Sequence, residues 1–242
     1  MNTQKLLPLL HFYLATVGNI APRRTNYTLW KLFSKPKRRS SRKGAPDDLL
    51  SQAIELKHTY KGYHINGYMW GQGAKQILLA HGWQSHAMDF KHLIPALVDQ
   101  GYQVIGFDMP AHGDSEGKIA HPPAFSDVWS GLLQKLGTPY AVIGHSMGAN
   151  AMTHVLSSRW EGPAVERFVA LAPPTDPPSF FYYFCQKLKL SDARAKELIA
   201  MTQEITGFAP QEFVMFDRFA ELKAEKVMVA YDKDDQTVPR RE

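Results

Sequence analysis

A serine between glycines, in the segment Gly-His-Ser-Met-Gly at residues 144–148, is the part of this sequence whose residue types and spacing most clearly predict chemistry. The segment follows a short apolar run at residues 140–144 and precedes a helical pattern at residues 147–159, so a strand, a sharp turn and a helix are expected. A serine on such a turn holds its hydroxyl clear of the sheet, and the crowded backbone requires the two glycines. The pattern predicts that Ser146 is a nucleophile.

Three further polar segments each follow a predicted strand. They are His-Gly-Trp at residues 81–83, Asp-Met-Pro-Ala-His-Gly-Asp-Ser at residues 108–115, and the stretch at residues 231–239 that ends in Val-Pro. No cluster with the spacing of metal ligands surrounds His112 and Asp114, so we do not expect a metal site there.

Short apolar runs alternate with helical patterns along most of the chain. Such alternation predicts βαβ units with right-handed crossovers, and therefore an α/β fold whose mostly parallel sheet is covered by helices on both faces. Lys61-Gly62 joins the first two β-rich runs and indicates a hairpin. The predicted strands are residues 53–60, 63–70, 76–80, 103–108, 140–144, 167–171 and 226–231, and the predicted helices are residues 88–100, 124–136 and 147–159.

The order of these motifs resembles that of the α/β-hydrolase superfamily from about residue 53 to the end of the chain. The resemblance implies an enzyme whose Ser146 attacks the substrate to form an acyl-enzyme. It also implies that the backbone N–H groups of Trp83 and Met147 form an oxyanion hole, which stabilises the negative charge that develops on the substrate oxygen.

The same resemblance assigns roles to two acidic segments. Asp235 stands before x-x-Val-Pro, as the acid of the family's catalytic triad does, and would orient the histidine and stabilise its imidazolium. Asp176 is a weaker candidate for this acid. The loop at residues 108–115 is expected to be structural, with Asp108 and His112 hydrogen-bonding the turn.

The resemblance fails at the catalytic base. In the family the order along the chain is serine, acid, histidine, but all ten histidines of this chain lie at or before His154, and His145 is expected to be a packing residue. The family's eighth strand and last helix also have no counterpart. We therefore expect the chain as given to be a very poor hydrolase and a marginally stable fold. The strand that ends at Tyr231 should form an edge, with side chains such as Val227 and Val229 open to water.

About fifty residues without a strand pattern separate the strand at 167–171 from the next one. This interval is too long for one connection, so we expect an inserted helical lid at about residues 176–224. Its aromatic residues fit either an apolar acyl or aryl substrate or the lid's own small core, and the sequence leaves both open. These residues are Phe180, Phe181, Tyr182, Tyr183, Phe184, Phe208, Phe213, Phe216 and Phe219.

The basic residues are concentrated at the start of the chain. Residues 1–46 carry ten Lys or Arg and no Asp or Glu, whereas the rest carries 18 basic and 23 acidic residues. We therefore expect a basic N-terminal arm, residues 1–46, before an α/β-hydrolase domain at residues 47–242. The body lacks a basic face with interleaved aromatic residues, so nucleic-acid binding is not expected. The apolar start is too short and too interrupted to span a membrane, although weak association of the arm with a membrane surface is possible, and an organellar transit peptide is a minor alternative.

The remaining composition is that of an ordinary globular domain, with 44% hydrophobic and 21% charged residues. Cys185 is the single cysteine, which excludes an internal disulfide and favours a reducing, cytoplasmic location. The leading expectation is a hydrolase of carboxylic esters or related acyl substrates that needs no cofactor and no metal. The alternatives are a non-catalytic or decayed member of the fold, a C–C bond hydrolase or a haloperoxidase. An epoxide hydrolase or haloalkane dehalogenase is disfavoured, because those relatives have aspartate in the place of Ser146.

Overall fold

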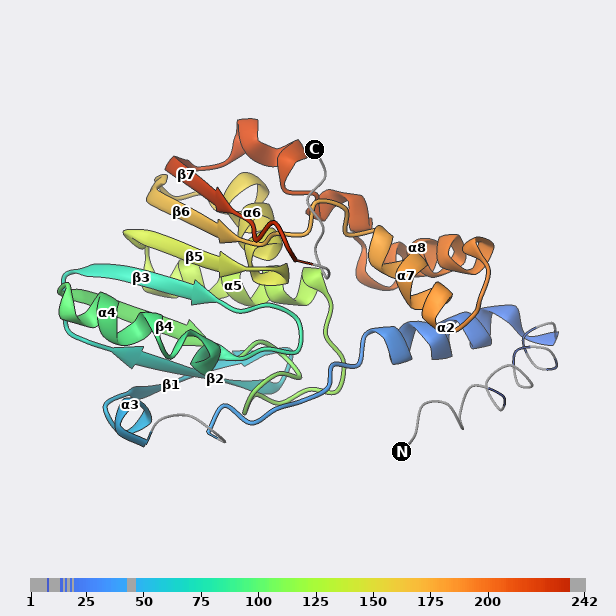
Figure 1. Cartoon of the computed structure of the whole chain (residues 1–242), viewed down its shortest axis with the longest axis horizontal. Coiled ribbons are helices and arrows are strands. Elements are labelled where there is room, and N and C mark those ends of the chain that lie inside the picture. Colours follow the sequence, from blue (N-terminus) through green and yellow to red (C-terminus); the bar gives the residue numbers. More distant parts are fainter. Residues whose placement is uncertain are drawn as a thin grey trace. The chain divides into compact units, whose positions relative to one another are not determined.

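The computed structural model describes residues 20–42 and 47–235, together with the single positions 8, 14, 16 and 18 (Figure 1). The chain divides into two compact units. One contains the central sheet and comprises residues 36–175 and the chain from 213 onward. The other is helical and joins residues 176–212 to the described part of residues 1–35.

The sheet has seven strands in the order β1-β2-β4-β3-β5-β6-β7. β1 and β2 form the predicted hairpin and β2 also pairs antiparallel with β4, whereas all later pairs are parallel. The mostly parallel sheet that the sequence predicts is therefore confirmed. The strands are β1 (Ile54–Tyr60), β2 (Tyr63–Trp70), β3 (Lys75–Ala80), β4 (Tyr102–Phe107), β5 (Ala141–His145), β6 (Val165–Leu171) and β7 (Ala224–Ala230).

Helices cover both faces of the sheet, and Figure 1 shows them on opposite sides of the strands. On one face α5 (Pro122–Leu136) and α6 (Met147–Ser158) pack on a core that includes Leu78, while on the other α3 (Asp47–Ser51) and α4 (Leu93–Asp99) pack on a core that includes Leu79. Successive side chains of a strand point to opposite faces, which explains why the run at β3 is apolar throughout.

The helix expected at residues 88–100 is interrupted. A short 3-10 helix, η1 (Ala87–Phe90), comes first, and α4 begins only at Leu93. Pro95 explains the break, because it has no N–H to bond the carbonyl of residue 91 and is tolerated only in the first turn of a helix. The sequence correctly predicted helical structure here, but the single continuous helix was wrong.

β7 pairs only with β6 in the part of the chain that the structure describes, so it lies at an edge of the sheet. Val227 and Met228 are exposed, at 41% and 54% of their full area. Val229 differs from the expectation, since it is only partly exposed and packs on the core beside α5 and α6. The exposed apolar area at this edge is therefore centred on two residues.

The helical unit contains α2 (Pro22–Phe33), α7 (Ser179–Lys187) and α8 (Asp192–Thr206), followed by the short 3-10 helix η2 (Pro210–Phe213). Trp30 of α2 is buried and its indole N–H donates to the hydroxyl of Thr202 on α8, at 3.0 Å. The ring of Phe33 packs against Phe181 and Phe184 of α7, with centroids 4.3 and 5.2 Å apart. The helix at the start of the chain is thus part of the core of this unit.

The aromatic residues expected in the lid are divided between the two units. Phe181 and Phe184 belong to the helical unit, whereas Phe213 stacks on His154 of α6, with ring centroids 4.5 Å apart. Next along the chain, the short 3-10 helix η3 (Phe216–Glu221) packs near α6, and Phe219 contacts the core there. A role of the helical unit as a lid stays a prediction.

Candidate active site

Ser146 lies on the turn between the end of β5 and the start of α6, as predicted. Its φ of 51° and ψ of −125° place a non-glycine residue in a strained part of conformational space that is typical of functional turns. Two backbone hydrogen bonds hold it there: its N–H donates to the carbonyl of Leu171 at 2.8 Å, and its own carbonyl accepts from the N–H of Ala149 at 2.9 Å. The turn, which follows β5, is therefore hydrogen-bonded to the carboxyl end of β6.

Three glycines let the surrounding backbone approach this serine. A Cβ on Gly144 would lie 2.6 Å from the Cα of Ala149, and one on Gly148 would lie 2.2 Å from the carbonyl oxygen of Ala80. A Cβ on Gly82 would lie 2.9 Å from the Cβ of Ser146. Side-chain atoms essentially never come so close, so only glycine allows α6 and the loop after β3 to meet at the serine.

Met147 supplies one potential oxyanion donor. It is the first residue of α6, and the N–H groups of the first turn of a helix have no acceptor within the helix. An N–H at this position adjoins the serine and points out of the positive end of the helix dipole.

The second potential donor, the N–H of Trp83, is oriented by a buried histidine. His81 donates from Nδ1 to the carbonyl of Gly82 at 2.8 Å and accepts the N–H of Met109 on Nε2 at 2.9 Å. Burial holds the pKa of His81 well below its usual value, which keeps the ring neutral as the acceptor role of Nε2 requires. In a trans peptide the Gly82 carbonyl and the Trp83 N–H point in opposite directions, so His81 turns the Trp83 N–H away from itself.

His112 holds the next peptide of the same loop. Its Nε2 accepts the N–H of Gln84 at 3.0 Å and its Nδ1 donates to the carbonyl of Pro110 at 2.9 Å. The ring is buried, and burial lowers its pKa to about 4. Asp108 accepts the N–H groups of Ala87 and Asp114 at 2.8 and 2.9 Å. The structural role predicted for residues 108–115 is confirmed.

A short segment of the N-terminal arm, residues 38–42, binds the same loops. Arg39 donates to the carbonyl of Gln84 at 3.1 Å and forms an ion pair of 2.5 Å with Asp89, while Arg38 donates to the carbonyl of Gly113 at 2.9 Å. Ser41 donates to the carboxylate of Asp108, which burial gives a raised pKa. The sequence carries little sign of this role, since a run of Arg and Ser is typical of a solvated tail.

A cavity of about 390 Å³ opens beside the turn. His145 and Leu171, which lie on either side of the backbone hydrogen bond of Ser146, contribute to its lining. The other residues that line it are Arg39, Trp83, Gln84, Ser85, Asp89 and Phe90. Three of these eight residues are apolar and five are polar or charged, so the cavity offers both an apolar wall and hydrogen-bonding groups to a small molecule.

Asp235 follows β7, and its electrostatic effect reaches the turn that carries Ser146. Burial lowers the pKa of His145, while the negative charges of Asp89 and Asp235 act in the opposite direction. Asp232 forms the turn before it, since its carboxylate accepts the N–H of Asp234 at 2.9 Å. Val238 and Pro239, on which the choice of Asp235 depends, lie outside the described residues.

No histidine ring is hydrogen-bonded to the hydroxyl of Ser146 within residues 20–42 and 47–235. His154 is committed elsewhere, with its Nδ1 2.7 Å from the hydroxyl of Ser126 in the core. Over the same residues, no three His, Cys, Asp or Glu side chains gather as metal ligands, and no helix is long and apolar enough to cross a membrane. The site thus brings together a strained serine, two oriented backbone donors and a small cavity.

We predict that Gly148→Ala lowers the free energy of unfolding by about 1–3 kcal/mol or more, because the new methyl group would collide with the backbone at Ala80. The matched control is Gly131→Ala in α5, where a Cβ would come no closer than 3.5 Å to the ring of His58. This change should stabilise the protein by about 0.5–1 kcal/mol. Urea unfolding measures both. Equal effects would contradict the close approach of α6 to β3.

We also predict that His112 makes stability depend on pH. Its pKa is about 4 in the fold and about 6.5 in an unfolded chain, so below pH 6.5 the unfolded state binds a proton that the folded state does not. Its contribution is therefore complete above about pH 6.5 and falls by about 3 kcal/mol as the pH approaches 4. Urea unfolding of the wild type and of His112→Gln, which keeps an acceptor but does not titrate, should give different slopes with pH. Parallel slopes would show that His112 is not buried in a neutral form.

The comparisons with known proteins bear on the family and the fold. Residues 71–207 match the family described as "Serine aminopeptidase, S33". The chain is 37% identical over 86 residues to "Epoxide hydrolase A" of Mycobacterium tuberculosis, and 40% identical over 77 residues to "Magnesium-chelatase 30 kDa subunit" of Rhodobacter capsulatus. The alignments cover 32% and 30% of this chain and 26% of either relative, so the chain spans about a quarter of the length of these curated relatives.

Among solved structures, an esterase of Pyrococcus furiosus shares the fold with a TM-score of 0.56 and 20% identity, over 81% of this chain and 87% of that one. The family match extends over more than half of the sequence. The chain belongs to the serine aminopeptidase (S33) family of the α/β-hydrolase superfamily.

Proposed function

We propose that this protein is a hydrolase of carboxylic esters or related acyl substrates that works through an acyl-enzyme on Ser146. The observation that carries the proposal is the strained backbone of Ser146, next to two N–H groups whose directions are fixed by α6 and by His81. Such fixed donors stabilise an oxyanion without the reorganisation that water would need. The chemistry requires neither a metal nor a cofactor.

In the proposed reaction the hydroxyl oxygen of Ser146 attacks the carbonyl carbon of the ester, and its proton passes to a base. The carbonyl oxygen becomes an oxyanion that accepts hydrogen bonds from the N–H groups of Trp83 and Met147. The alcohol leaves with a proton, and water then hydrolyses the acyl-enzyme to release the acid. Asp235 would orient the histidine that acts as base.

The catalytic base differs from the family pattern. No histidine of the 242 residues stands after the acid, where the family places it, so we expect this chain by itself to be a slow hydrolase. A non-catalytic role on the same scaffold is the alternative from another functional class. The relatives include an epoxide hydrolase and a chelatase subunit, so proteins with different functions share this likeness.

The cavity supports an apolar substrate group. Trp83, Phe90 and Leu171 contribute apolar walls, while Arg39 is already neutralised by Asp89. An ester with an aliphatic or aryl group is therefore favoured over an acidic substrate. Among the serine-dependent alternatives, C–C bond hydrolysis and haloperoxidase chemistry use the same nucleophile and are separated by assays with their own substrates. We also propose that the protein is located in the cytoplasm.

We predict that a fluorophosphonate probe labels Ser146. The proper control is Ser85→Ala, because Ser85 lines the cavity beside the turn and its hydroxyl donates to Asp89 at 2.6 Å. Labelling should be lost in Ser146→Ala and kept in Ser85→Ala, and peptide mapping by mass spectrometry should locate the adduct. Labelling that persists in Ser146→Ala would reject the assignment.

We predict that Asp235 and not Asp176 is the triad acid. In a version of the chain extended by the C-terminal segment of a serine hydrolase of this family, which supplies a histidine, p-nitrophenyl ester hydrolysis should be much faster than in the 242-residue chain. In that version Asp235→Asn should lower kcat by several orders of magnitude, as loss of the acid does in other triads. Asp234→Asn, in the same turn, is the matched control and should be mild. A severe loss in Asp176→Asn instead would show that the wrong acid was chosen.

A further inference from the structure

Helix α2 presents a solvent face that combines basic and apolar side chains. Its buried face, formed by Thr25, Asn26, Leu29 and Trp30, packs within the helical unit. The amide of Asn26 donates to Glu197 of α8 at 2.9 Å, which adds to the hydrogen bond of Trp30. Among the described residues of this unit, the contacts of α2 are therefore made through one side, and side chains on its other side are exposed.

The apolar side chains on the outer side are unusually open. Tyr27 and Leu32 of α2 are exposed to 45% and 50% of their full areas, and Ile20, which precedes α2, is exposed to 85%. The Nζ of Lys31 lies 4.6 Å from the centre of the Tyr27 ring, so charge and aromatic surface are adjacent. Five positions turn the helix by about 140°, so Tyr27 and Leu32 border the exposed side of α2, and Arg24 and Lys31 lie between them.

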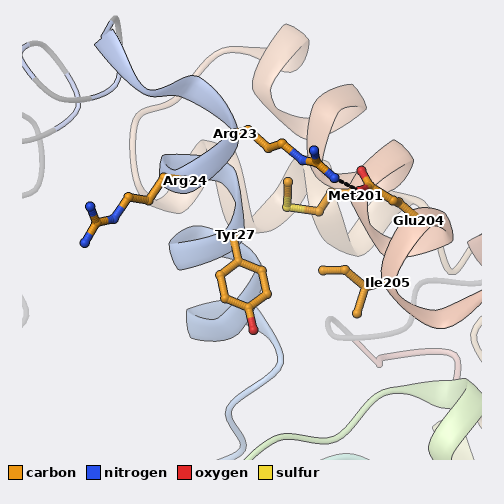
Figure 2. A pocket seen from close by; sticks show the side chains of 6 residues that line it. All are labelled: Arg23, Arg24, Tyr27, Met201, Glu204 and Ile205. Carbon is orange, nitrogen blue, oxygen red and sulfur yellow. Dashed lines mark hydrogen bonds and ion pairs between the residues drawn. The ribbon is translucent and has the colours of Figure 1, made fainter.

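A groove adjoins this face within the helical unit. Its volume is about 520 Å³, and it lies between α2 and α8 (Figure 2). Tyr27, Met201 and Ile205 provide the apolar lining, while Arg23 and Glu204 form an ion pair at its rim. Arg24 also lines the groove, and Figure 2 shows its side chain pointing away from Met201 and Ile205. The apolar area of α2 thus continues onto α8.

The charged side chains of α2 itself, Arg23, Arg24 and Lys31, are all basic. Residues 1–46 contain ten basic residues and no acidic residue. Arg38, Arg39 and Arg42 bind loops or acids of the sheet unit. Among the described cations of the arm, Arg24, Lys31, Lys35 and Lys37 remain exposed, and none of them has an ion pair to a described acidic residue. Within the helical unit the exposed cations without such an ion pair are therefore Arg24, Lys31 and Lys35, whereas Lys37 belongs to the sheet unit.

We propose that the outer face of α2 docks on an anionic membrane surface. Tyr27 and Leu32 would enter the headgroup layer, and Arg24, Lys31 and Lys35 of the same unit would lie near the phosphates of anionic lipids. A basic helix with aromatic and aliphatic side chains on its accessible face has the composition of interfacial helices. A nucleic acid would use the cations but gain little from the apolar side chains, so the mixture favours lipid. The proposal does not depend on the activity of Ser146.

Cosedimentation of the 242-residue protein with vesicles tests this. We expect binding to vesicles of equal parts phosphatidylglycerol and phosphatidylcholine, loss of binding at high salt, and little binding to pure phosphatidylcholine. Arg24→Gln with Lys31→Gln should weaken binding about 25-fold, because each basic residue near such a surface contributes about 5-fold. The control is Lys57→Gln with Lys226→Gln, which removes the same charge from exposed positions of β1 and β7 and should change little.

Two further measurements separate lipid from other anionic partners. Tyr27→Ser with Leu32→Ser should also weaken vesicle binding, and unchanged melting temperatures would show that the variants fold. A polarity-sensitive dye on Thr28→Cys should shift to the blue on anionic vesicles, since Cys185 is buried and will not compete for the dye. Three results would overturn the proposal: no binding to anionic vesicles, an equal loss in the Lys57 and Lys226 control, or equal binding to single-stranded RNA with no effect of Tyr27 and Leu32.

Discussion

The first turn of α6 approaches the end of β3 so closely that Gly148 lies directly against the carbonyl oxygens of Ala80 and His81. This contact decides where the positive end of the helix dipole lies and requires the left-handed φ of Ser146, since the chain must reverse within one residue. It also brings Gly82 against the serine. A small increase in the distance between α6 and the sheet would therefore separate the nucleophile from both proposed oxyanion donors.

The loops around this contact are held by polar groups that are buried and almost all bonded. His81 and His112 each use both ring nitrogens on backbone groups, and Asp108 accepts several hydrogen bonds at once. A buried polar group that lost its partner would be costly, so each bond restricts the loop to one arrangement. These hydrogen bonds fix the positions of the loops around the site. They also make the fold sensitive to acid, because His81 and His112 accept hydrogen bonds only as neutral imidazoles.

The sequence predicted the elements that follow from periodicity and the turns that follow from glycine. Every strand was found within a few residues, since a doubly covered strand has a distinctive apolar run, and the serine turn was recognisable from Gly144 and Gly148. It could not predict features that depend on distant contacts. The segment at residues 38–42 looks like a solvated tail because its partners, Gln84, Asp89 and Gly113, come 45 or more residues later. The placement of α2 in one unit with α8 was hidden for the same reason.

The long-range contacts within the helical unit affect the order in which the elements of the chain are buried during folding. Its core joins Trp30 to Thr202 and Phe33 to Phe181, across 172 and 148 positions of the sequence. Closing loops of this length is slow and entropically unfavourable compared with forming a local hairpin such as β1–β2. During synthesis α2 leaves the ribosome among the first elements, but its packing partners on α8 emerge only after nearly the whole sheet sequence. The helix made early is therefore among the last to be buried, and its apolar side remains accessible to chaperones throughout translation.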